Sequence, residues 1–213
     1  GAFHLAALTT RGDLYTMGSE YGWDRAEGNL LGHGEHHNED EDQSDEEDGV
    51  LWGAAGTPMD AAAPVLEPRG VFPPRQVEVE GLGPVAEVAC SSYSTAAVGV
   101  DGRVWTWGDG DGDALGHPHP CHRPTRLAQL GGQRVAHASL SYTNGATATD
   151  GGRVFVWGGD YWQGGISRES PGRAPGARGP REITWSGVPA AYACSSVALA
   201  WKHGFLVFRK RAT

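Results

Sequence analysis

One pattern occurs three times in this chain, and it constrains the fold more than any other feature. A glycine-containing turn, a short aromatic or β-branched run and a closing glycine follow one another at residues 11–18, 101–108 and 151–158. The closing glycines Gly108 and Gly158 lie 50 residues apart, whereas Gly18 and Gly108 lie 90 apart. The excess of 40 residues coincides with an acidic segment and the Ala/Pro/Gly-rich stretch after it. Self-similarity at a fixed period of this length indicates a repeat architecture.

Two further features recur in the same phase. One is a proline followed three residues later by an aliphatic residue, with spacings of 50 and 56 residues, at Pro74, Pro124 and Pro180. The other is a run of small and apolar residues before each turn, found at 5–8, 95–98 and 145–148, with 197–200 as a shortened fourth copy. This phase puts Cys90 and Cys194 at one repeat position, where we expect buried small hydrophobic side chains.

Each unit is predicted to form short β-strands. Asp101-Gly102 indicates a tight hairpin turn, because glycine accepts the positive φ that such turns require. The run from Val104 to Trp107 is aromatic and β-branched, as strands prefer. Gly108 then closes this strand, and proline is tolerated at the first position of the next one. Repeats of four short strands predict an all-β fold, a β-propeller whose blades surround an axis.

The repeat phase also predicts unit boundaries. We place them at residues 1–84, 85–134, 135–188 and 189–213 of a single domain, with an insertion at about residues 35–70. Without the excess of 40 residues about 170 remain, or about three and a half repeats of fifty. The structural positions of the repeat are Gly18, Gly108, Gly158, Trp107, Trp157, Cys90, Cys194, Pro74, Pro124 and Pro180.

The repeat resembles that of the RCC1 (regulator of chromosome condensation) family. The matching pieces are Gly1-Ala-Phe-His-Leu-Ala-Ala-Leu-Thr9, Gly28-Asn-Leu-Leu-Gly-His-Gly34, Val88-Ala-Cys-Ser-Ser92 and Asp113-Ala-Leu-Gly116. Met17 stands where the first unit should have Trp, and the Gly-x-Leu-Gly element is absent after Trp157. The family builds seven-bladed rings, so the resemblance implies part of a ring about twice as long. We therefore expect the sheet edges to be covered by missing blades of the same protein or by a neighbouring subunit of a complex.

The charge of the chain is concentrated in one segment. Residues 35–48 contain nine acidic and no basic residues, and subtracting them from 26 leaves 17 acids against 17 bases. Such a block predicts a solvated loop, and the neutral remainder disfavours direct DNA binding. A second candidate interaction loop is rich in Arg, Pro and Gly. The candidate residues of both loops are Glu39, Asp40, Glu41, Asp42, Asp45, Glu46, Glu47, Asp48, Arg168, Arg173 and Arg178.

The sequence contains no established metal or catalytic motif. His117-Pro-His-Pro-Cys-His122 holds four candidate zinc ligands, but a short proline-stiffened run wraps a tetrahedron poorly, so we interpret it as a loop. His33, His36 and His37 beside the acidic run could bind a metal adventitiously, but we expect no specific site there. The run from Asp109 to Asp113 fails the EF-hand pattern, because Ala114 and Pro120 occupy its glycine and glutamate positions. Nucleophile and phosphate-binding motifs are absent as well. We therefore predict no enzyme activity, cofactor or metal.

Composition constrains the compartment. Three cysteines cannot build a disulfide framework, which favours a reducing, intracellular compartment such as the cytosol, nucleus or cilium, with an organelle not excluded. No stretch approaches the roughly 18 apolar residues of a membrane span, so we expect no membrane insertion.

These observations lead to one function and two alternatives. The leading hypothesis is a non-catalytic protein–protein interaction module, a scaffold within a larger complex, because propellers carry recognition on variable loops. The first alternative, implied by the resemblance alone, is a guanine-nucleotide exchange factor for a small Ran-like GTPase. The second is an acidic loop that binds histones or other basic proteins, since it provides a strong negative patch.

Deleting residues 36–48 should leave the fold intact. The free energy of unfolding depends only weakly on loop length, so we expect a change below about 1 kcal/mol. Thermal melting of the full chain and the deletion variant, followed by circular dichroism, measures this. A loss of cooperative folding in the variant would show that the acidic run is structurally engaged.

Overall fold

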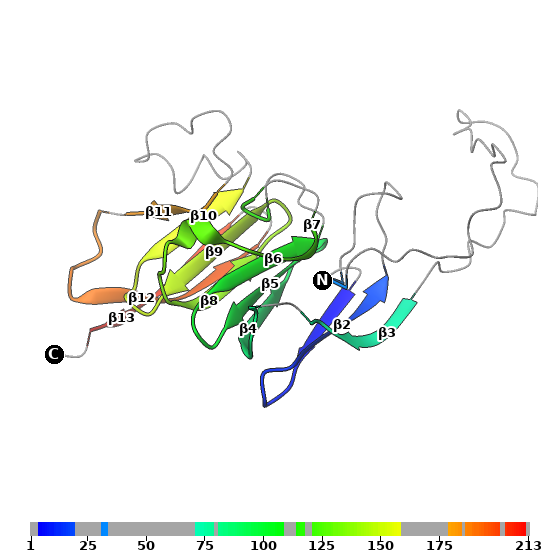
Figure 1. The fold of residues 1–213 in the computed structure, drawn as a ribbon. Helices are drawn as coiled ribbons and strands as arrows, with labels where there is room; N and C mark the ends of the chain where they lie inside the picture. The colour runs from blue at the N-terminus through cyan, green and yellow to red at the C-terminus, as the bar shows by residue number, and fades with distance from the viewer. Residues whose placement is uncertain are drawn as a thin grey trace, which may run out of the picture.

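A computed structural model describes residues 4–19, 31–33, 71–78, 81–108, 114–117, 121–158, 179–184, 186–200 and 203–211. Within these ranges the chain forms antiparallel β-sheets and one short 3-10 helix, η2 (Ala128–Leu130). Figure 1 shows the sheets side by side in chain order, from blue to red. The all-β prediction is confirmed.

The strands fall into four sheets in the described residues. The first sheet contains β1 (His4–Leu8), β2 (Leu14–Ser19) and β3 (Val71–Gln76). The second contains β4 (Val85–Cys90), β5 (Ser94–Gly99), β6 (Val104–Gly108) and β7 (Cys121–Arg126). The third contains β8 (Val135–Leu140), β9 (Asn144–Thr149), β10 (Val154–Gly158) and β11 (Arg181–Ile183). The fourth contains β12 (Tyr192–Leu199) and β13 (Gly204–Lys210).

The pairing register repeats from sheet to sheet. The closing glycines of β2, β6 and β10 face the first residues of β1, β5 and β9, in the pairs His4↔Gly18, Ser94↔Gly108 and Asn144↔Gly158. The strands β4, β8 and β12 each carry a bulge at their start, after Val85, Val135 and Cys194. Because a bulge locally changes the twist, its recurrence means that the three strands enter their sheets in the same way.

This register corrects the predicted phase of the last unit. Cys194 is equivalent to Val85 and Val135, not to Cys90, because a bulge follows it and its N–H donates to the carbonyl of Gly152 in the preceding hairpin turn. The hairpin that follows is set by the pair Leu199↔Gly204. Residues 197–200 therefore belong largely to this first strand, and residues 204–207 take the place predicted for them. Spacing alone suggested the wrong alignment, because the Ala-Cys-Ser-Ser sequence occurs at the end of one strand and at the start of another.

Consecutive sheets are joined by backbone hydrogen bonds at their hairpin turns. The N–H of Val85 donates to the carbonyl of Gly12 at 2.9 Å, and the N–H of Val135 donates to that of Gly102 at 2.9 Å. Gly102 has a φ of +78°, and a Cβ on this residue would lie 2.5 Å from Cγ of Arg134. The turn glycines thus permit both the hairpin and the close approach of the next sheet.

The core lies between the sheets. One cluster joins the first two sheets through Leu14, Val85, Ala97 and Trp107. A second joins β5 and β6 to β8 and β10, and a third joins β9 and β10 to β12. All residues of β5 and β9 are buried. The strands β5 and β9 are therefore covered on both faces, whereas β1 and β13 in the first and last sheets are partly exposed.

The prolines lie later in their strands than predicted. Pro74 and Pro124 are inside β3 and β7, whereas Pro180 directly precedes β11. Both strands begin earlier because they pair with Gly18 and Gly108 across a bulge. β3 and β7 are outermost in their sheets. Proline is tolerated there because an edge strand or a bulge does not require every N–H in the ladder.

Candidate interaction surfaces

One end of the sheets is where the longest connections begin and return; we refer to it as the long-connection rim. Strands β2, β6 and β10 end there, at Ser19, Gly108 and Gly158, and the outermost strands β3, β7 and β11 begin there (Figure 1). The connecting segments contain residues 20–70, 109–120 and 159–180. All predicted acidic and Arg interaction residues fall in the first and third segments, outside the described residues. Segments far apart in sequence are thus attached to the same rim.

The rim is braced by a threonine and a histidine in each of the first two sheets. Thr106 Oγ1 donates to the carbonyl of Leu115 at 2.7 Å and lies 3.0 Å from His117 Nε2. Because its one proton is used on Leu115, Thr106 accepts from Nε2–H, which also lies 3.3 Å from the Thr106 carbonyl. Thr16, Leu31 and His33 repeat this arrangement. In the third sheet Val156 takes the threonine position.

The threonine–histidine brace involves His117, one of the candidate zinc ligands from the sequence. His117 is buried and its Nε2 is engaged by Thr106, so this nitrogen is committed to the rim. His36, His37 and His119 lie outside the described residues. In the described part of the chain no three metal-ligating side chains cluster.

Thr106→Val should lower the free energy of unfolding by about 1–3 kcal/mol, because it removes the buried hydroxyl that donates to the Leu115 carbonyl and contacts His117 Nε2. Thr147→Val is the matched control. Thr147 is fully buried, and its Oγ1 has no hydrogen-bond partner. Removing this hydroxyl should be neutral or stabilising. Urea titrations of both variants measure the difference, and equal losses would contradict the role of the brace.

Trp107 in the second sheet and Trp157 in the third sheet each pack against the long connection of the preceding sheet. The Trp157 Nε1–H donates to the carbonyl of Ala114 at 2.7 Å, and its ring packs on Gly116 and Gly145. A Cβ on Gly32 would lie 2.6 Å from Nε1 of the fully buried Trp107. The Gly-x-Leu-Gly element and the tryptophan of the next repeat therefore form one packing unit.

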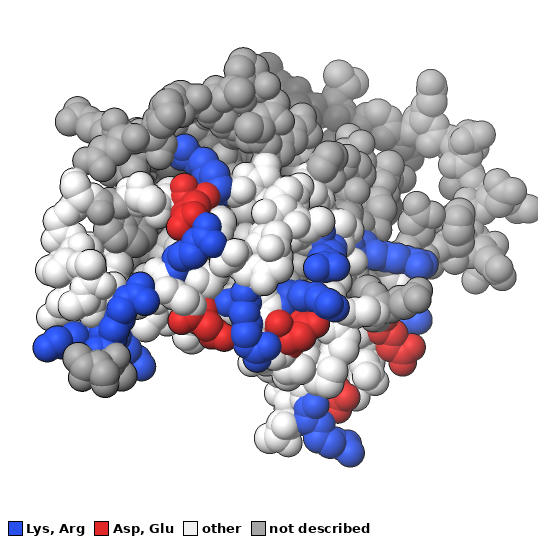
Figure 2. Space-filling view, turned by 60° about the vertical axis from the view of Figure 1, so that its left-hand side comes forward, with Lys and Arg blue, Asp and Glu red and all other residues white. Residues whose placement is uncertain are grey.

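The opposite rim contains the short hairpin turns and most of the described ion pairs. Arg103 pairs with Asp101 at 3.2 Å and Arg134 with Asp150 at 2.9 Å. Arg153 contacts Glu182 with two guanidinium nitrogens, and this hydrogen bonding lowers the pKa of Glu182. Figure 2 shows such basic and acidic side chains next to one another. In these exposed pairs the charges largely neutralise each other, and their effect on stability is small.

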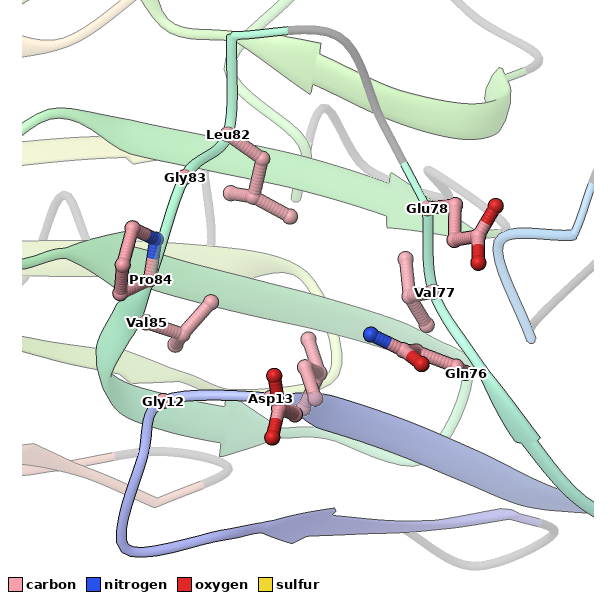
Figure 3. Close-up of a pocket in the computed structure, with 10 residues that line it drawn as sticks. Gly12, Asp13, Gln76, Val77, Glu78, Leu82, Gly83, Pro84 and Val85 are labelled. Carbon is pink, nitrogen blue, oxygen red and sulfur yellow. The ribbon is translucent and has the colours of Figure 1, made fainter.

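A hollow of about 610 Å³ opens between the first and second sheets at this rim (Figure 3). Its apolar lining consists of the buried side chains of Leu14, Val77, Leu82 and Val85. Its polar lining comes from Asp13, Gln76 and Glu78. Asp13 accepts a hydrogen bond from Thr9 Oγ1 at 3.0 Å and lies 3.9 Å from Nε of the exposed Arg11. Sequence reasoning missed this site, because its residues come from two segments about sixty positions apart.

The first strands of neighbouring sheets are linked by side chains. The Glu87 carboxylate accepts from the N–H of Ala138 at 3.3 Å and lies 3.4 Å from His137 Nδ1. In the same way Ser139 Oγ accepts from the N–H of Leu199 at 2.9 Å. These contacts satisfy backbone donors that strand pairing leaves open. Neither Glu87 nor His137 was identified from the sequence. The two residues occupy the same repeat position, directly after the bulge of β4 and of β8, and this shared position was the one available signal.

The titratable side chains of His4, Cys90 and Cys194 are buried or half-buried. Burial lowers the pKa of His4 to about 4, and His4 Nε2 lies 2.7 Å from Thr95 Oγ1 of the second sheet. Burial raises the pKa values of Cys90 and Cys194. Cys194 is buried as expected, whereas Cys90 is half-buried. Their thiols are therefore protonated at neutral pH and have little nucleophilic character.

Comparison with known proteins agrees with this geometry. The family model described as regulator of chromosome condensation (RCC1) repeat matches residues 101–145. Human E3 ubiquitin-protein ligase HERC2 is 31% identical over 206 residues, which cover 82% of this chain and 4% of HERC2. The crystal structure of human WBSCR16 aligns with a TM-score of 0.62 at 19% identity, covering 98% of this chain and 43% of that one. The structure of Prp20p from Saccharomyces cerevisiae aligns with a TM-score of 0.66 at 14% identity, covering 100% and 43%.

The fold is thus a partial β-propeller, in which the described residues form two four-stranded sheets, one three-stranded sheet and one two-stranded sheet. The chain is an RCC1-like repeat protein. It spans a small part of HERC2 and less than half of each aligned structure. Within the described residues no helix is long and apolar enough to cross a membrane.

Proposed function

We propose that this chain is a non-catalytic protein–protein interaction module in which the segments at the long-connection rim carry recognition. The observation that carries the proposal is the shared attachment of these segments. Residues 20–70, 109–120 and 159–180 each leave a sheet at an equivalent glycine and return on its outermost strand. A rigid stack that presents variable segments on one rim is the arrangement by which scaffolds bind partners.

The chemistry of these segments favours a basic partner. Nine acidic residues lie in residues 35–48, whereas the third segment contributes Arg168, Arg173 and Arg178. The solved structure of Prp20p, to which this fold is similar, is described together with its binding properties to Gsp1p and histones. A dense negative segment attracts basic proteins over about one Debye length, so binding should weaken as salt increases.

Purified core histones are the probe for this proposal. We expect the full chain to bind them in a salt-dependent manner, and deletion of residues 36–48 to weaken binding by at least about tenfold. A variant with Arg168, Arg173 and Arg178 changed to Ala is the control, since it should not weaken this contact. Undiminished binding by the deletion variant would rule out recognition through the acidic segment.

A parallel assay distinguishes the exchange-factor alternative. A small Ran-like GTPase loaded with fluorescent GDP is mixed with the chain, and nucleotide release is followed with time. The interaction-module proposal predicts release at the intrinsic rate. Acceleration by catalytic amounts of the chain would support the exchange-factor function instead.

A further inference from the structure

The hollow between the first and second sheets is lined by acidic side chains at a position where the second and third sheets have arginines. The register makes Asp13 equivalent to Arg103 and Arg153, and Gln76 equivalent to Arg126 and Glu182. In the third sheet this position is occupied by an ion pair, Arg153 with Glu182. In the first sheet an acid stands in place of the arginine, and Glu78 adds a second carboxylate two residues after Gln76.

The third sheet therefore shows what this place accommodates. The guanidinium of Arg153 contacts the Glu182 carboxylate with two nitrogens and lies 5.2 Å from the centroid of the Phe155 ring. Among the described residues of the first sheet, Asp13 forms an ion pair with Arg11, whose Nε lies 3.9 Å from the Asp13 carboxylate and whose side chain is 89% exposed. Such an exposed contact contributes little, so the carboxylates of the hollow retain most of their negative potential.

We propose that the hollow binds an arginine side chain of a partner polypeptide. This inference rests on the proposed function as an interaction module, and it adds a second contact on the opposite rim. The buried side chains of Leu14, Val77 and Val85 provide an apolar surface for the aliphatic stem of the arginine. The carboxylates of Asp13 and Glu78 receive its guanidinium, whose planar donors match carboxylates better than an ammonium does.

The backbone keeps the hollow open on one side. Gly83 has a φ of +61°, and a Cβ placed on it would meet no atom within 4 Å. Pro84 follows, at the position that Arg134 occupies between the next two sheets. Arg134 extends its guanidinium to the carbonyl of Val100 at 2.7 Å. Proline has no such side chain, so the chain itself supplies no cation from this position. Figure 3 shows Asp13, Gln76 and Glu78 around the opening.

Methyl NMR on the full chain tests the proposal. The probe is N-acetyl-arginine N-methylamide, and the reporters are the methyl groups of Leu14, Val77, Leu82 and Val85. We expect saturable shifts of these methyls with a dissociation constant on the order of millimolar, as for a single side chain. The neutral isostere citrulline in the same blocked form should cause no saturable shift, and blocked lysine should bind more weakly than arginine.

Charge-neutral variants sharpen the result. Asp13→Asn and Glu78→Gln should each weaken arginine binding by about two- to fivefold, and the double variant should weaken it further. Asp101→Asn, in an equivalent hairpin outside the hollow, is the matched control and should leave the dissociation constant unchanged. Variant spectra that retain the dispersed methyl signals show that the fold is intact.

Each outcome is decisive. No saturable shift, or equal shifts with arginine and citrulline, would overturn the hollow as a guanidinium site. An equal loss in the Asp101→Asn control would assign the binding to general electrostatic attraction and overturn the proposal as well. These results leave the histone assay unaffected, because that assay depends on residues 36–48. Failure of the hollow and failure of the proposed function are therefore distinguishable.

Discussion

Gly158→Ala is expected to lower the free energy of unfolding by at least about 3 kcal/mol. Gly158 ends β10 with a φ of +111°, in a region that residues with a side chain rarely adopt. A Cβ there would lie 2.1 Å from the carbonyl oxygen of Thr143 and 2.6 Å from Cα of Asn144. Both are backbone atoms of the neighbouring chain segment, so neither can move aside without breaking the pairing of β9 with β10. Urea unfolding followed by circular dichroism measures the loss.

The control for this prediction is Gly132→Ala. Gly132 has a φ of +79°, but a Cβ there would meet no atom within 4 Å. Gly132→Ala should therefore lower the free energy of unfolding by about 1–2 kcal/mol, which is the cost of a left-handed backbone conformation without a steric clash. The difference between the two variants reports the close approach at Gly158 alone. Equal destabilisation would show that only the backbone conformation matters at this position.

Trp157→Ala is expected to destabilise the fold by about 3–5 kcal/mol. Its ring is 4% exposed and fills the space between the connection at Gly116 and its own sheet at Gly145. Because these glycines have no side chains, they cannot fill the vacated volume, and a cavity is expected between the second and third sheets. Removal of the ring also leaves the Ala114 carbonyl without its donor.

Trp157→Phe separates the two contributions. Phenylalanine keeps most of the apolar ring but lacks the Nε1–H group, so we expect a loss of about 1–2 kcal/mol. Tyr192→Ala is the exposed control, since Tyr192 is 41% exposed, and its effect should stay below about 1 kcal/mol. A loss for Trp157→Ala as small as that for Tyr192→Ala would contradict the fastening role of Trp157.

The candidate surfaces were accessible to sequence reasoning to different degrees. The acidic and Arg-rich segments are visible in the sequence because composition alone distinguishes them. The hollow is not visible in the sequence, since Asp13 and Glu78 line the same space only when β2 and β3 pair across a long connection. The Thr106–His117 brace has a weak sequence signal. The Leu-Gly-His element occurs both after Thr16 and after Thr106, and it is lost where Val156 replaces the threonine.

The sequence by itself determined the repeat and its local geometry. The run of small and apolar residues before each turn, the turn at Gly102 and the bend at Gly108 are properties of a few neighbouring residues, so a single unit specifies them. Their recurrence at a fixed spacing was enough to predict an all-β stack of repeated sheets.

Only the tertiary structure decided how the units meet. Cys194 resembles Cys90 in its sequence neighbourhood, but a backbone hydrogen bond from its N–H to Gly152 and the bulge after it place it with Val85 and Val135. Pro74 and Pro124 lie in the middle of their strands and not at the start, because the partner strands extend the pairing beyond them. Such choices depend on hydrogen bonds and packing between residues far apart in the chain, and local patterns of turns and apolar residues do not record those contacts.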